Sequence, residues 1–312
     1  MDLKHRQNKA AAHIRNIFEQ KSMPRNQVAA LSGLSNPYIQ HLENGQINNV
    51  NRKKIIALAI ALGLDLDEID EMLTIFDRAK LQEADIPFFI DPGMKRKITS
   101  AMLPLHGGFT YELILSIGEK IIGKSIIVND RPTANLQPEG FRTFLDRDFI
   151  NSHPLHFQLL ESIGQDRYNN FIETLNKYSV DHYICQPCLE EYMHDCRDKE
   201  EKEWRRKHLS LLIKILSNFK SFNLYLMDYC PKFNFTLKIP ATEDVKNEQL
   251  FFQGRSIHSK SIERDHRLFG FATESPAVVQ NFKEALLGIK KSVINDLLDK
   301  KKLINYLKSL LC

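Results

Sequence analysis

The sequence predicts two structural classes in one chain: an all-α domain at the N-terminus, followed by an α/β or α+β domain. Up to residue 82, apolar residues recur at the three- and four-residue spacing of amphipathic helices. Residues 86–93, IPFFIDPG, then join a short apolar run to an Asp-Pro-Gly turn, which is typical of a domain boundary. From residue 222 onward the segments are aromatic-rich and partly alternating, which indicates strands.

We therefore assign residues 1–80 to the first domain with its connecting helix. Residues 92–312 form the second domain, which divides again near 200–220 if this part holds two domains. At 312 residues the chain is long enough for two or three domains. Its composition, 43% hydrophobic and 26% charged, is that of an ordinary globular protein.

Composition also limits where the protein is expected to act. No run of about 18 apolar residues occurs, so we expect no transmembrane helix and no membrane partner. The first 16 residues are polar and basic and lack the apolar core of a signal peptide. The five cysteines are odd in number and clustered, which argues against a secreted disulfide framework. A cytoplasmic protein is therefore expected.

Five helices are expected in the first domain. The first covers residues 8–21, and the second lies within 25–32 and ends at a turn containing Gly33. The fourth covers residues 52–62, and the fifth runs from an N-cap at Asp65 to about residue 82. The residues expected to face inward on the first two helices are Ala12, Ile14, Ile17, Phe18, Val28 and Leu31.

The third helix lies in residues 35–45, SNPYIQHLENG, around which the first domain is organised. The hydroxyl of Ser35 can cap the helix, and Pro37 falls in the first turn, where a missing N–H costs little. Ile39 and Leu42 share one face and can anchor the helix to a core. The outer face then carries Asn36, Pro37, Gln40, His41 and Asn44.

A helix, a glycine turn and a capped helix follow one another in the order of a helix-turn-helix motif. Residues 12–64 resemble the lambda-repressor/Cro-like, or XRE, family of DNA-binding domains. The residues that carry the resemblance are Val28, Ala29, Ser32, Gly33, Leu34, Ser35, Tyr38, Ile39, Leu42, Glu43, Asn44 and Gly45, with IIALAIALGL similar to the family's fourth helix. Two positions depart from it: Pro24 stands where the family usually has a capping Ser or Thr, and Arg25 where Gln is common.

The resemblance implies double-stranded DNA as a partner and a homodimer that reads two half-sites. Asn36 and Gln40 are expected at base edges, because Gln and Asn can bond adenine in a bidentate way. Pro37 and His41 flank them. Arg25, Asn44, Arg52 and Lys53 are expected to contact phosphates. The full predicted DNA-binding set is Arg25, Ser35, Asn36, Pro37, Gln40, His41, Asn44, Arg52 and Lys53.

Charge is distributed unevenly along the first domain. Residues 1–60 hold nine Lys or Arg and three Asp or Glu, a net charge of +6. Residues 61–90 hold eight acidic and two basic residues, a net charge of −6. Because Lys and Arg neutralise phosphates, the basic segment is expected to face DNA and the acidic one to point away from it.

In the second domain, strands are expected at residues 124–130, 180–185, 222–230, 233–241, 250–257 and 267–275. Helices are expected at 109–122, at 154–178 as two helices broken at Gly164, and at 188–219 as one long charged helix. Two amphipathic helices close the chain. Their apolar stripes fit either core packing or a dimer interface.

The segment DHYICQPCLEEYMHDC, residues 181–196, holds a candidate metal set of Cys185, Cys188, His194 and Cys196. Cys-x-x-Cys is a chelating spacing that suits a tetrahedral ion such as zinc. A proline between the two cysteines is also compatible with a redox pair. Free cysteines inside a cell otherwise behave as small hydrophobic residues. Structural, zinc-binding and redox-active interpretations all remain open.

The segment IHSKSIERDHRLFG, residues 257–270, places His258, Lys260 and Asp265 in the spacing H-x-K-x-x-x-x-D. This is similar to the signature of the phospholipase D superfamily, in which His is the nucleophile, Lys binds phosphate and Asp orients the His. The signature occurs once, whereas that family pairs two copies. A catalytic site, a phospholipase-like fold retained only as a ligand sensor, and an exposed polar hairpin are the three interpretations.

Together these features predict a sequence-specific transcriptional regulator with a C-terminal domain that senses a small-molecule or peptide effector and dimerises. Two alternatives belong to other functional classes. One is a phosphodiesterase-like enzyme tethered to DNA, which would use His258 and Lys260. The other is an antitoxin or phage-type repressor whose second domain binds a protein partner.

Overall fold

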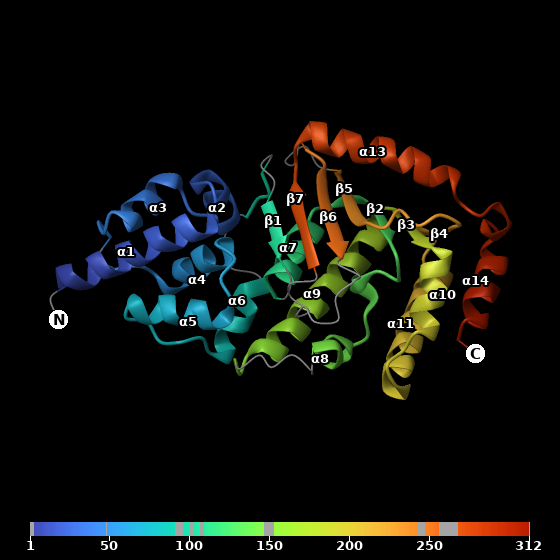
Figure 1. Ribbon diagram of the computed structural model, residues 1–312, viewed down its shortest axis with the longest axis horizontal. Helices are drawn as coiled ribbons and strands as arrows, with labels where there is room; N and C mark the ends of the chain where they lie inside the picture. Colours follow the sequence, from blue (N-terminus) through green and yellow to red (C-terminus); the bar gives the residue numbers. More distant parts are fainter. Residues whose placement is uncertain are drawn as a thin grey trace.

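The computed structural model describes residues 3–47, 49–90, 96–99, 103–106, 109–146, 153–241, 247–255 and 268–311. Figure 1 shows a purely helical N-terminal domain on the left and a mixed sheet with its covering helices on the right. The all-α domain followed by an α/β domain confirms the predicted fold class. No helix among these residues is long and apolar enough to span a lipid bilayer.

Five helices build the N-terminal domain around a continuous apolar core. They are α1 (Leu3–Lys21), α2 (Arg25–Ser32), α3 (Asn36–Glu43), α4 (Arg52–Ala61) and α5 (Leu66–Ile75). Ile14, Ile39 and Ile69 are fully buried at its centre. Asp65 and Glu68 form a capping box at the start of α5, with both hydrogen bonds at 2.8 Å.

The fifth helix is shorter than its apolar spacing predicts. It ends at Ile75, and Asp77 adopts a left-handed backbone conformation with φ of 58°. The Asp70 carboxylate accepts a hydrogen bond from the backbone N–H of Leu81 at 2.6 Å. The returning chain is therefore folded back onto α5 instead of continuing the helix to residue 82.

The predicted boundary segment forms part of the junction between the two domains. After a short 3₁₀ turn, η1 (Glu83–Asp85), the chain forms α6 (Ile86–Ile90). Phe88 and Phe89 of α6 are buried in the same apolar cluster as Leu159 and Ile163 of the second domain. The core of the helical domain is thus continuous with part of the α/β core, because the apolar run that predicts a linker is itself buried.

Seven strands of the described residues form one mixed sheet. They are β1 (Leu103–His106), β2 (Gly123–Asn129), β3 (Val180–Cys185), β4 (Phe222–Met227), β5 (Asn234–Pro240), β6 (Gln249–Arg255) and β7 (Leu268–Thr273). Their order is β1-β7-β6-β5-β2-β3-β4. β2, β3 and β4 are parallel, and all the other neighbouring pairs are antiparallel. Every residue of β3 is buried, as expected for a parallel strand covered on both faces.

Helices cover both faces of this sheet (Figure 1). They are α7 (Phe109–Glu119), α8 (Phe141–Asp146), α9 (His156–Lys177), α10 (Gln186–His194), α11 (Lys199–Asn218), α13 (Pro276–Lys291) and α14 (Lys300–Ser309), with 3₁₀ turns η2 (Ala134–Leu136) and η3 (Asn295–Leu297). On one face, α9, α11 and α14 share an apolar cluster with Val180 and Ile184 of β3. On the other face, α13 packs over Tyr183 and Cys185.

Two predicted helix boundaries in this domain are wrong. The break expected at Gly164 does not occur, since α9 is continuous through this residue. A Cβ at Gly164 would lie 2.5 Å from Nε of Arg142, so the glycine serves the close approach of that side chain. The expected helix over 188–219 is two helices, α10 and α11, and Asp198 caps the second of them.

Candidate nucleic-acid interface

The third helix presents its polar face to solvent. Ile39 and Leu42 are buried and fix α3 to the core of the domain. The Ser35 hydroxyl caps the helix by accepting a hydrogen bond from the Tyr38 N–H at 3.3 Å. The predicted contact residues that lie exposed together on and beside α3 are Ser35, Asn36, Pro37, Gln40, His41 and Asn44. In Figure 1, α3 lies at the edge of the molecule, away from the sheet.

An ion pair ties the second helix to the end of the third. Arg25 Nε lies 2.7 Å from Glu43 Oε2, and Arg15 of α1 donates to the backbone carbonyl of Glu43. The Arg25 side chain stays 45% exposed, whereas that of Glu43 is only 10% exposed. Arg25 therefore positions α3 while part of its guanidinium faces solvent. Arg15 was not selected from the sequence, because its role depends on a contact 28 residues away.

Arg52 has partners other than the DNA phosphate that was predicted for it. Its Nη2 lies 2.6 Å from Asp85 Oδ2 and donates to the carbonyl of Lys80 at 2.7 Å. Its Nη1 donates to the carbonyl of Ala79. The guanidinium thus joins the start of α4 to the chain that leads into the second domain, and its donors are used within the protein.

Two lysines of α4 lie over aromatic rings of other helices. Lys53 is exposed, with Nζ 5.7 Å from the centroid of the Phe88 ring. Lys54 Nζ lies 4.2 Å from the centroid of the Tyr38 ring on α3, in a cation–π contact. Lys54 is therefore a basic residue directly beside α3 that the sequence analysis did not select. This contact depends on the tertiary placement of α3 and α4 in the domain.

The geometry agrees with the comparison against protein families. Residues 14–69, from the middle of α1 to α5, match the family described as Helix-turn-helix. This part of the chain is an XRE-family helix-turn-helix domain, a class of domain that binds DNA. The resemblance inferred from residues 12–64 is thereby confirmed, and residues beyond 69 have no family assignment. Neither the search of curated proteins nor the search of solved structures found a match.

The predicted cysteine set is only partly brought together. Cys185 ends β3, Cys188 lies in the first turn of α10, and Cys230 follows β4. The three sulfurs all lie within 4.8 Å of one another. His194 is exposed at the end of α10, and the Cys196 thiol lies 3.6 Å from the carbonyl oxygen of Met193. Neither belongs to the group found among the described residues.

The phospholipase-like residues His258, Lys260 and Asp265 lie outside the described residues. The strands on either side of them in the sequence are β6, which ends at Arg255, and β7, which begins at Leu268. These two strands pair antiparallel. The two strands of the expected context are therefore present, and the segment between them that carries the signature lies outside the described residues.

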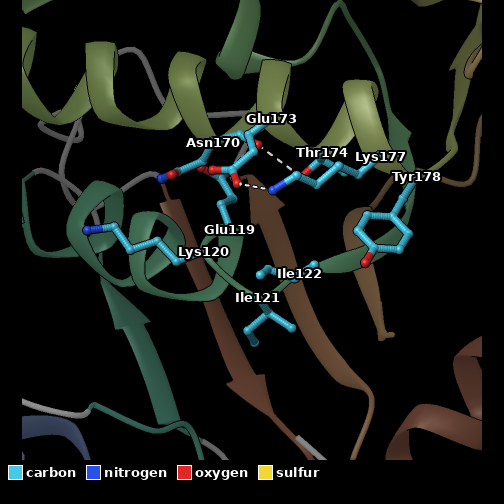
Figure 2. Close-up of a pocket in the computed structure, with 9 residues that line it drawn as sticks. All are labelled: Glu119, Lys120, Ile121, Ile122, Asn170, Glu173, Thr174, Lys177 and Tyr178. Atoms are coloured by element: carbon cyan, nitrogen blue, oxygen red, sulfur yellow. Dashed lines mark hydrogen bonds and ion pairs between the residues drawn. The ribbon is translucent and has the colours of Figure 1, made fainter. Parts of the chain in front are cut away.

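The described part of the α/β domain contains hollows of very different size. The one in Figure 2, between the C-terminal ends of α7 and α9, has a volume of about 20 Å³. Glu173 and Lys177 form an ion pair beside it at 2.7 Å. A space of this size holds about one water molecule. It is therefore too small for an effector.

Two larger hollows of about 350 and 520 Å³ both border on Pro138 and Leu211. We call them together the α9–α11 groove, because α11 lines the larger, more open hollow and α9 lines the smaller one. Volumes in this range are typical of small-molecule sites. The smaller hollow is bordered by Glu139, Gln165 and Tyr168, so it offers charged, polar and aromatic groups to a ligand.

Proposed function

We propose that this protein is a sequence-specific DNA-binding regulator of transcription whose α/β domain senses an effector and dimerises. The observation that carries the proposal is the exposed polar face of α3 within a helix-turn-helix domain. Asn36 and Gln40 supply amides for base edges, and the basic residues of the first 60 positions supply charge for phosphates.

A direct chain of contacts supports communication between the two domains. The backbone N–H of Lys97 donates to the carbonyl of Ala30 on α2 at 2.8 Å. Two residues later, the carbonyl of Thr99 accepts from the N–H of Glu274, just after β7, at 3.0 Å. Ile98 between them is 2% exposed. A shift at the end of β7 would therefore act on the helix that precedes α3.

Dimerisation follows from the way such domains read DNA. Helix-turn-helix repressors bind two half-sites about one helical turn apart, which requires a second copy. Leu287 on α13 and Leu298 near the C-terminus are 61% and 55% exposed. Leu286, Ile289 and Leu303 of the closing helices are buried in the core, so a dimer contact in this region would use the exposed Leu287 and Leu298. Sedimentation of the full chain as a dimer is the expected result.

The effector is expected in the α9–α11 groove, and we propose a regulator rather than an enzyme. Regulation requires that the effector favour one of two states with different DNA affinity. A small molecule that changes DNA affinity supports this assignment. A protein partner recovered with the α/β domain, without any small-molecule effect, would favour the repressor with a protein partner instead.

The test begins by selecting a preferred duplex from random DNA with the full chain. Gln40→Ala is then expected to weaken binding to that duplex by about 1–3 kcal/mol and to relax one base position. Gln158→Ala, the same change at an exposed position on α9, is the matched control and should leave affinity unchanged. Equal affinity of the parent protein for selected and random duplexes would contradict sequence-specific regulation.

A further inference from the structure

The three clustered cysteines come from three separate elements at one end of the sheet. Cys185 is the last residue of β3 and the N-cap of α10, and it is fully buried. Cys188 donates its backbone N–H to the Cys185 sulfur at 3.5 Å, and its own sulfur lies 3.4 Å from that of Cys230. Figure 1 shows α10 and these strand ends on the side of the sheet away from the helix-turn-helix domain.

The fold holds Cys230 in place independently of any ligand. Parallel pairing of β3 and β4 sets Cys185 opposite Met227, three residues before Cys230. Asp228 then donates its backbone N–H to the carbonyl of Ser292 at 3.0 Å, which pins the loop to the end of α13. The three sulfurs are therefore brought together by backbone contacts.

The spacing of the sulfurs suits a single metal ion. Thiolates bound to one tetrahedral zinc ion at about 2.3 Å have sulfurs about 3.8 Å apart. Here all three sulfurs lie within 4.8 Å of one another, so small rotations of the side chains complete the geometry. Cys188 and Cys230 are only half-buried, which leaves the site reachable from solvent.

The surroundings also tolerate the negative charge of bound thiolates. The first turn of α10 directs backbone N–H groups toward the site, and Cys185 already accepts one of them. Arg131 is an electrostatic neighbour of Cys188.

We propose that Cys185, Cys188 and Cys230 bind one thiophilic metal ion of the zinc and cadmium class. Three thiols each lose a proton to solvent and form three sulfur–metal bonds, so a divalent ion yields a site with one net negative charge. Among the described residues no further His, Cys, Asp or Glu completes the group. Three sulfurs leave one position of a tetrahedral ion open to water or another ligand. The site is independent of the proposed regulatory function, since it involves no residue of the DNA-binding surface.

The experiment uses the full chain, reduced and stripped of metal by a chelator, and titrated with zinc and with cadmium. One ion per chain is expected by mass spectrometry under native conditions. A thiolate-to-cadmium charge-transfer band in the ultraviolet is expected, as is a higher midpoint of thermal unfolding with metal than without it. Cys188→Ser and Cys230→Ser should each weaken binding by at least about 100-fold, more than loss of a supporting residue around a metal site.

Cys196→Ser is the matched control, because this thiol lies on the segment after α10 but outside the group. It should bind metal as the parent chain does. Far-UV circular dichroism without metal checks that the serine variants are folded. Absence of binding by the reduced parent overturns the proposal, and so does equal binding by the folded Cys188 and Cys230 variants. A Cys188–Cys230 disulfide in protein that binds no metal after reduction would show a redox pair instead.

Discussion

Two buried histidines show how the same side chain takes opposite roles at neighbouring sites. His208 bonds through one ring nitrogen to the Tyr192 hydroxyl at 2.9 Å and through the other to the Thr133 carbonyl at 3.0 Å. His182, in the middle of β3, has no hydrogen-bond partner among the described residues for either nitrogen. Burial, with a smaller contribution from His208, lowers the pKa of His182 to about 3. His182 is therefore neutral and unsatisfied.

His182→Leu is expected to leave stability at pH 7 unchanged or higher, because no partner is lost and an unpaired polar group is removed. The pKa of His182 is lower in the folded than in the unfolded state. The unfolded chain therefore takes up protons first, and stability falls as pH drops from about 6.5 toward 3. The free energy of unfolding of the variant minus that of the parent should therefore be about 2 kcal/mol larger at pH 5 than at pH 7. Urea unfolding at both values measures this.

His208→Leu provides the contrast, because it leaves the Tyr192 hydroxyl and the Thr133 carbonyl without this partner. It is expected to lower stability at pH 7 by about 1–3 kcal/mol. The two variants make the same chemical change at two fully buried sites. If they lose stability equally at pH 7, the distinction drawn from their hydrogen bonds is wrong.

At the scale of elements, a buried ionic network joins α7, α8 and α9. Glu112 of α7 is bonded by the guanidinium groups of both Arg142 and Arg167. Arg167 also pairs with Glu119, with nitrogen–oxygen distances of 2.6 and 2.8 Å. The side chains of Arg142 and Arg167 are 8% and 3% exposed. Such a network holds the three helices in one arrangement, because each charge depends on its partners.

Glu112→Gln keeps the shape of the side chain and removes the charge that two buried arginines share. We expect a loss of about 3–5 kcal/mol in the free energy of unfolding. Glu173→Gln on α9 is the control, since its pair with Lys177 is exposed to solvent and should contribute little to the free energy of unfolding. If chemical denaturation gives the same loss of unfolding free energy for Glu112→Gln and Glu173→Gln, burial of the network does not strengthen it.

The same network predicts acid sensitivity. Burial alone would raise the pKa of Glu112, but the charges of Arg142 and Arg167 lower it to about 2. Because this value lies below that of the unfolded chain, the stabilisation is complete above about pH 4.5 and is lost as pH falls toward 2. In Glu112→Gln this part of the acid dependence should be missing.

At the scale of the whole molecule, the helical and α/β domains are joined by a packed interface. Residues 96–99, which we call the strap, link the two domains through the backbone hydrogen bonds of Lys97 and Thr99. In addition, His153 Nε2 lies 3.4 Å from Asp70 Oδ2 of α5, and both side chains are nearly buried. Ile98 belongs to the apolar cluster that runs from α1 through α6 into α9. The two domains should therefore unfold and move as coupled bodies.

Ile98→Ala removes buried methyl groups at this junction and is expected to cost about 2–5 kcal/mol. Hydrogen exchange should become faster at the Lys97 and Glu274 amides, because both bonds depend on the strap. Ile122→Ala, which is 43% exposed, is the matched control and should change stability by less than about 0.5 kcal/mol. If exchange at the two amides stays at the parent rate, the strap does not couple the domains.

Features carried by neighbouring residues could be predicted from the sequence. The Ser35 cap, the Gly33 turn and the exposed face of α3 depend on spacing within about ten residues, so they identify the helix-turn-helix domain directly. The strand at 180–185 was predicted with its observed bounds, since Val180, Tyr183 and Ile184 are β-branched or aromatic residues that favour strands. The aromatic-rich segments after residue 222 likewise located β4, β5, β6 and β7.

Only the tertiary structure decided which distant side chains meet. Cys230 joins Cys185 because β3 and β4 pair in one particular register, and no local spacing records that register. The ion pair of Arg52 with Asp85 and the close approach of Arg142 to Gly164 likewise join residues that are far apart in the sequence. Local patterns reflect the chain's own periodicity and capping. The thiol cluster, the ionic network and the junction between the domains arise from packing between residues that lie tens of positions apart.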